Sequence, residues 1–277
     1  MSLCVQDLIN QHKQLEPISQ SSYLDTLLLI EKALNQSRNA LLAWPENSVD
    51  NNQVLAFESL FKRRIQGEPI AYLLGEQEFW SLPFFVNSDT LIPRPDTELM
   101  IELACDLFEK KSCINMIDVG TGSGAIALAL ASERPHWSII ASDICQKALC
   151  VANKNKQALQ KNITLLQANH LQSIADDIFD LIISNPPYID VHDPHLLDLS
   201  YEPKKALISS EQGFYDLKLI IKQAKHCLKD KGYLLLEHGN TQAALVRKIL
   251  EDNGFLSVVT HQDLAGLDRV TLGRKSC

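Results

Sequence analysis

Four consecutive residues, Asn185-Pro186-Pro187-Tyr188, combine groups that are able to hold a planar –NH2 group. The Asn185 side chain offers both a carbonyl acceptor and an amide donor. Each proline lacks an N–H and fixes its φ near about −65°, so the Pro186 carbonyl is an acceptor with a set direction. Tyr188 can form an apolar wall with a polar tip. The same residues are also common turn signals, so they could simply end a strand.

The tetrapeptide follows a run that predicts a buried strand. Residues 179–183 are apolar and rich in β-branched side chains, which is typical of a strand covered on both faces of an α/β sheet. Such sheets bind ligands just beyond the carboxyl ends of their strands. The position of the tetrapeptide therefore favours a reaction centre, although its residue types alone leave the strand ending open.

A second candidate site follows residues 114–119, another strand-like run. Gly120-Thr121-Gly122-Ser123-Gly124 comes next, and residues 125–132 then form a predicted helix. Glycines let a ligand approach the backbone while the helix N-terminus supplies N–H donors, so this arrangement predicts a nucleotide-cofactor site. Because Gly120-x-Gly122-x-x-Ala125 also satisfies the relaxed dinucleotide fingerprint, a nicotinamide enzyme and a methyl-donor enzyme both stay open here.

Asp143 comes directly after the next predicted strand, residues 137–142. A carboxylate at that point can accept both hydroxyls of an adenosine ribose in either cofactor class. The alternative is an N-cap for the helix predicted over residues 146–159. The preceding glycine loop favours the ribose role.

The remaining pattern alternates strands with helices. Strands are predicted over residues 163–167, 233–237, 256–261 and 269–272, and further helices over 215–228 and 242–251. This alternation with a final strand pair indicates the α/β class, with a doubly wound, mostly parallel sheet of seven strands that ends in a hairpin.

The N-terminal part differs, because residues 1–75 show helical spacing and no strand-like alternation. They predict a small helical bundle, acting either as a cap on the main domain or as a module that docks a partner. One of its apolar stripes is formed by Tyr23, Leu24, Leu27, Leu28 and Leu34. Residues 76–90 predict a β-hairpin or extended linker, and residues 91–277 form the main domain.

A helix is predicted to open at Pro95 and to run to about residue 110. Proline suits a first helical turn, and Asp96 and Glu98 suit the positive end of the helix dipole. Capping explains these acids, but it leaves Arg94, between two prolines, without a role.

Composition narrows the function classes. The chain of 277 residues carries a net charge of −8, which argues against nucleic acid as a direct partner, since duplex binding depends on Lys and Arg contacts to phosphate. No apolar run reaches membrane-spanning length, and the N-terminus lacks the basic start of a signal peptide.

Seven cysteines without a Cys-x-x-Cys pair favour reduced thiols in a cytoplasmic protein. His192, Asp193 and His195 lie on a proline-containing loop, and a solvated surface explains them better than a metal site.

Taken together, these residues resemble the class I methyltransferases that use S-adenosylmethionine. Asp118-x-Gly120-x-Gly122-x-Gly124 is similar to their first motif, and Asn185-Pro186-Pro187-Tyr188 resembles the motif of members that methylate amide or exocyclic amino nitrogens. The chain is most similar to the peptide chain release factor glutamine N5-methyltransferases, through residues 67–73, 78–80, 91–98, 185–190 and 235–239. The ribosomal-protein glutamine methyltransferases share the tetrapeptide but differ from the form of residues 93–98 seen here.

The resemblance implies a site and a substrate. Residues 120–124 and Asp143 would hold the methionine and ribose parts of S-adenosylmethionine, and His170 would flank adenine, with Asn169 where the family often has an acid. Asn185 would lie against the cofactor and, with Pro186, Pro187 and Tyr188, form the catalytic motif. The implied substrate is the glutamine of the Gly-Gly-Gln loop in class I release factors, with residues 1–75 as the docking domain.

Other functions share parts of this pattern. An adenine-N6 DNA methyltransferase uses the same tetrapeptide on a flipped base, but the net charge and the lack of a recognition insert count against it. A cofactor-binding regulator without activity would keep the fold, and a nicotinamide oxidoreductase would not need the tetrapeptide.

Overall fold

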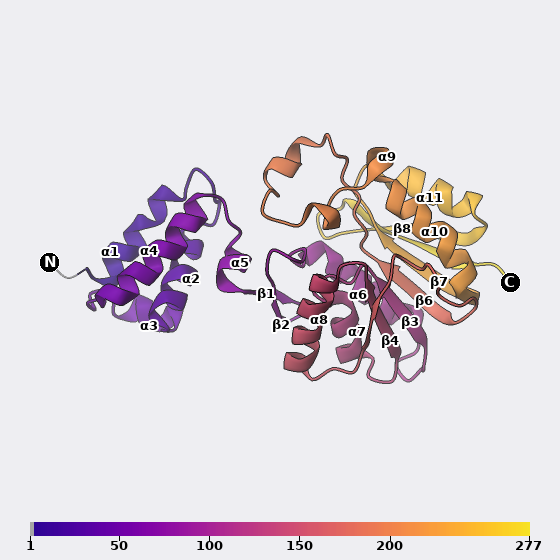
Figure 1. The fold of residues 1–277 in the computed structure, drawn as a ribbon, viewed down its shortest axis with the longest axis horizontal. Coiled ribbons are helices and arrows are strands. Elements are labelled where there is room, and N and C mark those ends of the chain that lie inside the picture. Colours follow the sequence, from indigo (N-terminus) through magenta and orange to yellow (C-terminus); the bar gives the residue numbers. More distant parts are fainter. Residues whose placement is uncertain (1–2) are drawn as a thin grey trace. The chain divides into compact units, whose positions relative to one another are not determined.

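The computed structural model describes residues 3–277 and divides the chain into two compact units, Met1–Glu76 and Gln77–Cys277 (Figure 1). None of the helices within residues 3–277 has the length and apolar composition that crossing a bilayer requires.

The first unit is helical. Its helices are α1 (Val5–Ile9), α2 (Ser22–Leu34), α3 (Arg38–Ala43), α4 (Asn51–Ile65) and α5 (Ile70–Leu74), with a 3-10 turn η1 (Asn10–Gln14). The core packs Leu29 and Ile30 of α2 against Phe57 and Phe61 of α4. The side chain of Asp50 begins α4 by accepting the Asn52 N–H at 2.8 Å, a capping role that the sequence type predicts.

The predicted apolar stripe of α2 is partly wrong. Tyr23 and Leu24 are 46% and 41% exposed, whereas Asp25 is buried. Asp25 is buried because Arg64 of α4 donates to its Oδ2 at 2.9 Å and satisfies its charge. A prediction from hydrophobic spacing places the charged residues Asp25 and Arg64 on the surface. The predicted buried face of α2 therefore differs from the face that is buried in the structure.

A hairpin of β1 (Glu76–Phe79) and β2 (Leu82–Phe85) follows the boundary between the units, which lies after the first residue of β1. Phe79 and Phe84 are buried in the same core as one face of the large sheet. Asn155 of α8 (Gln146–Leu159) fixes β2, because its side chain bonds the N–H and the C=O of Phe85 at 2.7 and 3.0 Å. The hairpin thus packs as a part of the second unit.

Seven strands form the large sheet, in the order β5-β4-β3-β6-β7-β9-β8. They are β3 (Asn115–Val119), β4 (Ser138–Asp143), β5 (Thr164–Gln167), β6 (Phe179–Ser184), β7 (Leu228–Glu237), β8 (Phe255–Gln262) and β9 (Asp268–Lys275). β9 runs antiparallel between β7 and β8, and the other pairs are parallel. The predicted α/β class with a doubly wound, mostly parallel sheet is confirmed.

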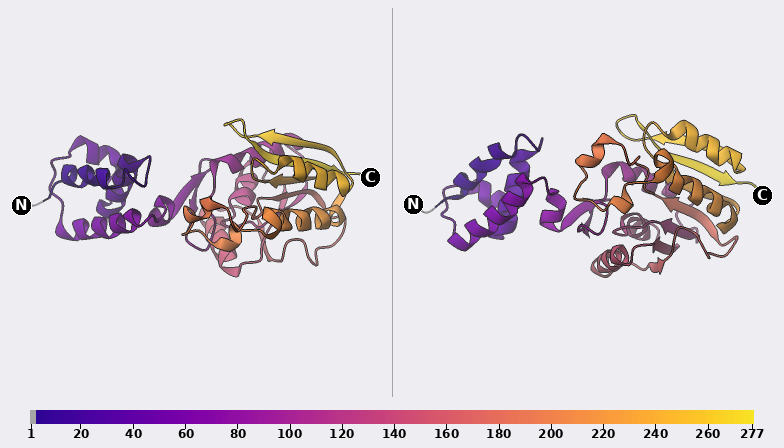
Figure 2. Two further views of the ribbon diagram at one scale, coloured as in Figure 1. Left: turned by 90° about the horizontal axis from the view of Figure 1, so that it is seen from above. Right: turned by 45° about the horizontal axis from the view of Figure 1, so that its top comes forward.

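Helices cover both faces of this sheet (Figure 2). α6 (Glu98–Leu107) and α7 (Ala125–Glu133) pack on one face, with α8 beside α7. α10 (Tyr215–Cys227) and α11 (Ala243–Asp252) pack on the other face. Short turns η2 (Pro95–Thr97), η3 (Pro194–Leu197), η4 (Lys204–Ala206) and α9 (Ser210–Gly213) lie in the connections.

Two predicted boundaries differ from the structure for identifiable reasons. α6 ends at Leu107 because Phe108 turns to an extended conformation and packs edge-on against Trp137 and Tyr233, with ring centroids 5.6 and 5.9 Å apart. β7 begins at Leu228, where the backbone pairs with Phe179 before the register shifts toward Tyr233. Such shifts depend on tertiary pairing and leave no periodic signal in the sequence.

Candidate functional site

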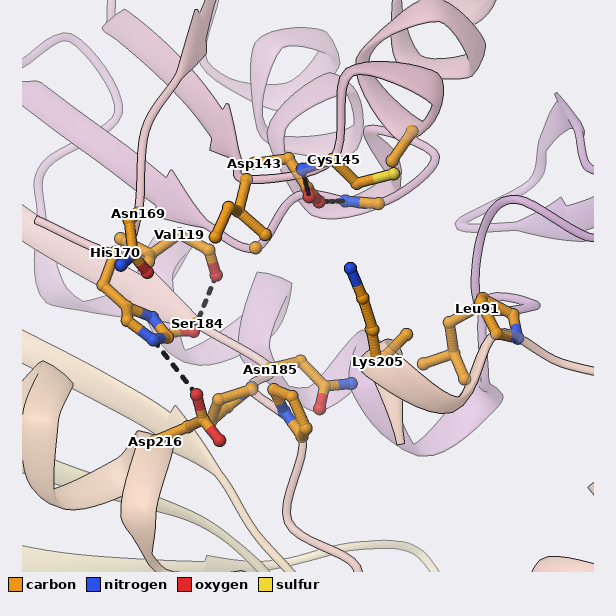
Figure 3. A pocket seen from close by; sticks show the side chains of 18 of the residues that line it. Leu91, Val119, Asp143, Cys145, Asn169, His170, Ser184, Asn185, Lys205 and Asp216 are labelled. Atoms are coloured by element: carbon orange, nitrogen blue, oxygen red, sulfur yellow. Dashed lines mark hydrogen bonds and ion pairs between the residues drawn. The ribbon is translucent and has the colours of Figure 1, made fainter. Parts of the chain in front are cut away.

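A cavity of about 470 Å³ lies at the carboxyl ends of β3, β4, β5 and β6 (Figure 3). Its lining includes Gly120 and Gly122 after β3, Asp143 at the end of β4, His170 after β5 and Asn185 after β6. The strand order reverses between the neighbouring strands β3 and β6, and open α/β sheets bind ligands at such a switch point. The structure therefore gathers the main sequence-predicted positions around one space.

The glycine loop has two separate functions. Gly120 and Gly122 have φ of +76° and +57°, and a Cβ at either position would meet nothing within 4 Å, so the loop is open toward a ligand. Gly124 is different, because a Cβ there would approach Ala152 of α8 to 3.3 Å. Among the described residues, Thr121, Ser123 and Gly124 do not line the cavity; Thr121 donates to Asp118 Oδ2 at 2.6 Å and so shapes the loop.

Asp143 ties the loop to the next helix. Its Oδ2 accepts the Gly122 N–H at 3.0 Å, and its Oδ1 accepts the Cys145 N–H at 2.8 Å. Burial raises the pKa of Asp143, while these backbone donors oppose that shift. The N-cap of α8 is Cys145, so Asp143 supports the turn before the helix and keeps further lone pairs toward the cavity.

His170 is held from a distant part of the chain. Its Nε2 lies 3.0 Å from Oδ1 of Asp216 in the first turn of α10, and Ser209 donates to the other carboxylate oxygen. Burial would raise the pKa of Asp216, but the hydrogen bonds from His170 and Ser209 lower it overall. Asn169 instead donates to Gln172 Oε1 at 3.3 Å. The sequence did not reveal Asp216, because it resembles an ordinary acid at a helix start.

A second cavity of about 160 Å³ adjoins the first. It is lined by Leu91, Arg94, Asn185, Pro186, Tyr188, Ile189, Leu199, Ala206, Leu207 and Glu237. Leu91, Asn185, Pro186 and Ala206 line both cavities, and we call this common border the shared wall. A group in one cavity and a group in the other would meet beside these residues.

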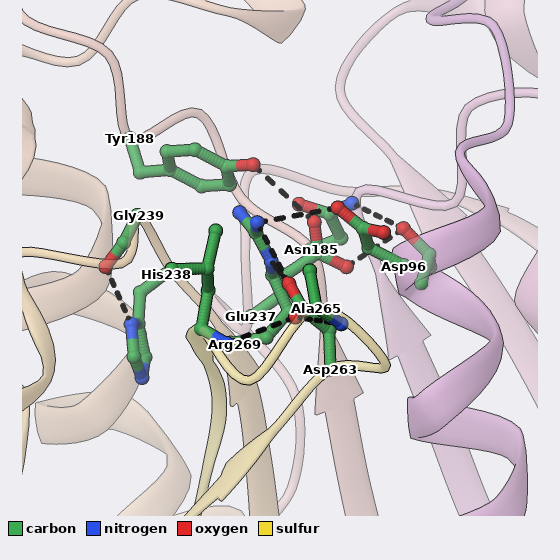
Figure 4. A network of polar contacts seen from close by, with 11 residues as sticks. Asp96, Asn185, Tyr188, Glu237, His238, Gly239, Asp263, Ala265 and Arg269 are labelled. Carbon is green, nitrogen blue, oxygen red and sulfur yellow. Dashed lines mark hydrogen bonds and ion pairs between the residues drawn. The ribbon is translucent and has the colours of Figure 1, made fainter.

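Some polar atoms of the tetrapeptide already have hydrogen-bond partners in the protein and others do not (Asn185 and Tyr188 are labelled in Figure 4). The Asn185 side-chain nitrogen donates to Thr97 Oγ1 at 3.3 Å, and the Tyr188 carbonyl accepts from Gln242 at 3.0 Å. Within residues 3–277, no hydrogen bond uses Asn185 Oδ1 or the Pro186 carbonyl. The two acceptors on the shared wall are therefore open to a ligand.

A buried acid, Glu237, lies beside this wall and lines the smaller cavity. Glu237 at the end of β7 accepts from Thr97 Oγ1 at 2.7 Å and from the Tyr188 hydroxyl at 3.3 Å. Burial raises the pKa of Glu237 to about 7, and burial also raises the pKa of Tyr188, which keeps the phenol protonated as a donor. Thr97 and Glu237 belong to stretches that resemble the family, residues 91–98 and 235–239, but no role for either could be predicted from the sequence.

The segment 199–207, called the roof below, contributes lining residues to both cavities: residues 203–206 to the larger one, and Leu199, Ala206 and Leu207 to the smaller one. Glu202, only 4% exposed, accepts the Ile92 N–H at 3.0 Å and pairs with the Arg94 guanidinium. This pairing explains the arginine between two prolines. From the same roof, Lys205 points its side chain into the larger cavity (Figure 3).

The candidate metal residues do not form a cluster. His195 Nδ1 lies 2.7 Å from Asp193 Oδ1, two residues away on an exposed loop. Within residues 3–277, no group of three or more His, Cys, Asp or Glu side chains is arranged to hold a metal ion.

The fold and this pair of cavities define a class I methyltransferase, and comparisons with known proteins agree. Residues 110–269 match the family model described as methyltransferase domain. A methyltransferase structure from Pyrococcus furiosus has the same fold, with a TM-score of 0.56 and 15% identity, covering 79% of this chain and 100% of that one.

The family can be stated more narrowly. Residues 6–75 match the model of the PrmC N-terminal domain. Release factor glutamine methyltransferases from Shewanella oneidensis and Escherichia coli are 45% and 44% identical, covering 94% and 95% of this chain and 92% and 98% of theirs. The chain belongs to the release factor glutamine methyltransferase family.

S-adenosylmethionine is the cofactor of this class, and the larger cavity fits it. Its volume lies within the usual range of small-molecule sites. Gly120, Gly122, Asp143, Asn169 and His170, the lining residues that the sequence analysis linked to the methionine, ribose and adenine parts, all border this one cavity.

Proposed function

We propose that this protein transfers the methyl group of S-adenosylmethionine to the side-chain amide nitrogen (N5) of the glutamine in the Gly-Gly-Gln loop of class I release factors. The named activity of its relatives supports this substrate. The observation that carries the proposal is the shared wall, where two open acceptors, Asn185 Oδ1 and the Pro186 carbonyl, border both cavities.

These acceptors match the two hydrogens of a primary amide. A glutamine nitrogen is a poor nucleophile because its lone pair is delocalised into the carbonyl. Asn185 and Pro186 hold both N–H groups, aim the nitrogen from the smaller cavity into the larger one and stabilise the positive charge that develops on it, which are contributions of position and of preorganised dipoles. S-adenosylmethionine supplies a methyl group that is already activated by its sulfonium.

Tyr188 and Leu91 give the smaller cavity an apolar lining suited to the methylenes of a glutamine side chain. The bond from nitrogen to the methyl carbon forms as the methyl–sulfur bond of the sulfonium breaks and leaves a neutral thioether, and the nitrogen then loses one proton. An N-alkylated amide cation is strongly acidic, so water is a sufficient acceptor and the site needs no strong base.

A comparison of acceptors tests the proposal. The enzyme is incubated with methyl-labelled S-adenosylmethionine and, separately, a purified release factor, ribosomal proteins and duplex DNA, and the modified residue is mapped by mass spectrometry. Label on the Gly-Gly-Gln glutamine is the expected result. Label on a ribosomal-protein glutamine or on adenine N6, with none on the release factor, would replace the substrate assignment.

Residues 1–75 serve in this proposal as the docking domain for the folded release factor, which the match to the PrmC N-terminal model supports. The free thiols of all seven cysteines suit a reducing compartment, and this supports the cytoplasm as the place of action. The substrate is a protein, and no direct contact with nucleic acid is part of the proposal.

A further inference from the structure

Asn185 is connected to the buried acid Glu237 by a single hydroxyl group. Thr97 Oγ1 lies 2.7 Å from Glu237 Oε2 and 3.3 Å from Asn185 Nδ2. Thr97 is 5% exposed and Glu237 is 2% exposed, so water cannot easily replace either partner. Thr97 belongs to η2, Asn185 to the turn after β6 and Glu237 to the end of β7; Figure 4 labels Asn185 and Glu237.

The direction of these hydrogen bonds follows from the number of hydrogens. A threonine hydroxyl carries one hydrogen, and a carboxylate can only accept. The Thr97 hydrogen therefore points to Glu237, and its oxygen is left with lone pairs toward Asn185. Only the –NH2 end of the Asn185 amide can bond those lone pairs, so Oδ1 is turned to the other side.

We infer that Glu237 and Thr97 are positioning residues that set which end of the Asn185 amide faces the substrate. This inference rests on the proposed function, because it matters only if Asn185 Oδ1 accepts from the substrate amide. We call the two hydrogen bonds from Asn185 to Thr97 and from Thr97 to Glu237 the relay. Without the relay, the Asn185 amide is free to rotate and present its –NH2 group, which would repel the N–H groups of a glutamine instead of accepting them.

The charge on Glu237 has no direct ion pair among the described residues. Tyr188, after β6, donates to Oε1 at 3.3 Å, while Asp96 of η2 and Arg269 of β9 lie close by. Arg269 is already paired with Asp96 at 3.2 Å and Asp263 at 3.0 Å. Burial consequently dominates and raises the pKa of Glu237 to about 7.

Below that pH a protonated Glu237 can donate to Thr97, which frees the threonine hydrogen and removes the preference for one amide orientation. The kcat should therefore rise with pH through about 7 and level off above it, from the pKa of Glu237. In Glu237→Gln, which has no proton to lose, this rise should disappear. If kcat of Glu237→Gln still fell at low pH as in the wild type, another group would be the cause of that fall.

Hydroxyl removal tests the relay directly. Thr97→Val keeps the shape and should lower kcat by about 10- to 100-fold, less than direct loss of a preorganised acceptor, with unchanged affinity for S-adenosylmethionine by calorimetry. Thr97→Ser restores the hydroxyl and should recover most of the rate. Thr271→Val, which removes another buried hydroxyl of the same unit bonded to His238, is the matched control and should leave kcat within about twofold.

A double-mutant cycle separates positioning from general damage. In an Asn185→Ala background, Thr97→Val should cause little further loss, because its effect passes through the missing amide. Additive losses, or wild-type kcat in Thr97→Val, would overturn the relay. If Asn185→Ala itself keeps full activity, the proposed mechanism fails rather than the relay, so the two failures are distinguishable.

Discussion

Gly213 lies outside both cavities, yet the structure predicts that it controls the rate. It has φ of +85°, and a Cβ built there would lie 2.1 Å from the Tyr188 carbonyl oxygen and 2.8 Å from Gln242 Nε2. Gln242 is the donor that holds this same carbonyl. The new Cβ in Gly213→Ala would therefore displace the backbone of the tetrapeptide and disrupt the hydrogen bond from Gln242 to the Tyr188 carbonyl.

The size of the effect follows from that distance. Real Cβ atoms keep at least 3.0 Å from other heavy atoms, so Tyr188 must move by about 1 Å, a misplacement that can cost about 10²-fold in rate. The left-handed backbone adds about 1–2 kcal/mol of strain with any side chain. We expect kcat to fall about 100-fold while the affinity for S-adenosylmethionine stays within a few-fold, since Gly213 does not line the larger cavity.

Gly266 provides the matched control. It has φ of +76°, and a Cβ there would meet nothing within 4 Å, so Gly266→Ala carries the strain without the collision. Single-turnover methylation, calorimetric cofactor binding and urea unfolding should be measured on both variants. Gly266→Ala should lose stability but not rate. A Gly213→Ala enzyme with the kcat of the Gly266→Ala control would refute the requirement for a fixed turn.

Three further outcomes are expected. Asn185→Ala should lower kcat by about 10²–10³-fold in steady-state methylation, because one of two preorganised acceptors is lost; wild-type turnover would remove the mechanism. Glu202→Gln should raise KM for cofactor and release factor by about tenfold, since the roof loses a charged hydrogen bond to Arg94, and unchanged KM values would show that the roof is held otherwise. Deletion of residues 1–75 should raise KM for the folded release factor far more than for a short Gly-Gly-Gln peptide, and equal effects on both would contradict docking.

Most of the fold could be predicted from local sequence patterns. The strand runs, the glycine loop and the tetrapeptide each depend on neighbours within a few residues, and the structure contains the seven strands near their predicted positions. Because the carboxyl ends of parallel strands meet at one edge, the ligand positions after β3, β4, β5 and β6 could be expected to converge. They line one cavity in the structure.

The supporting contacts could not be predicted in the same way. Thr97 and Glu237 are 140 positions apart, Arg94 and Glu202 are 108 apart, and Asp25 and Arg64 are 39 apart. Each pair buries a polar or charged side chain whose partner is brought near only by the finished fold. A periodicity argument assigns such residues to the surface, which is why the apolar stripe of α2 was misplaced and Glu202 and Asp216 were missed.

Glu237 lines the smaller cavity and has a pKa of about 7, so a role as general base has to be weighed against a positioning role. Before the new bond forms, an amide N–H is far too weak an acid for a carboxylate of that pKa to deprotonate. After the bond forms, the nitrogen is so acidic that water removes the proton, so a base would contribute little at either stage. Both Glu237 oxygens are also engaged by hydroxyl donors, Thr97 and Tyr188. Thr97→Val separates the two roles, because it leaves a base in place but releases Asn185, and only positioning predicts that kcat then falls.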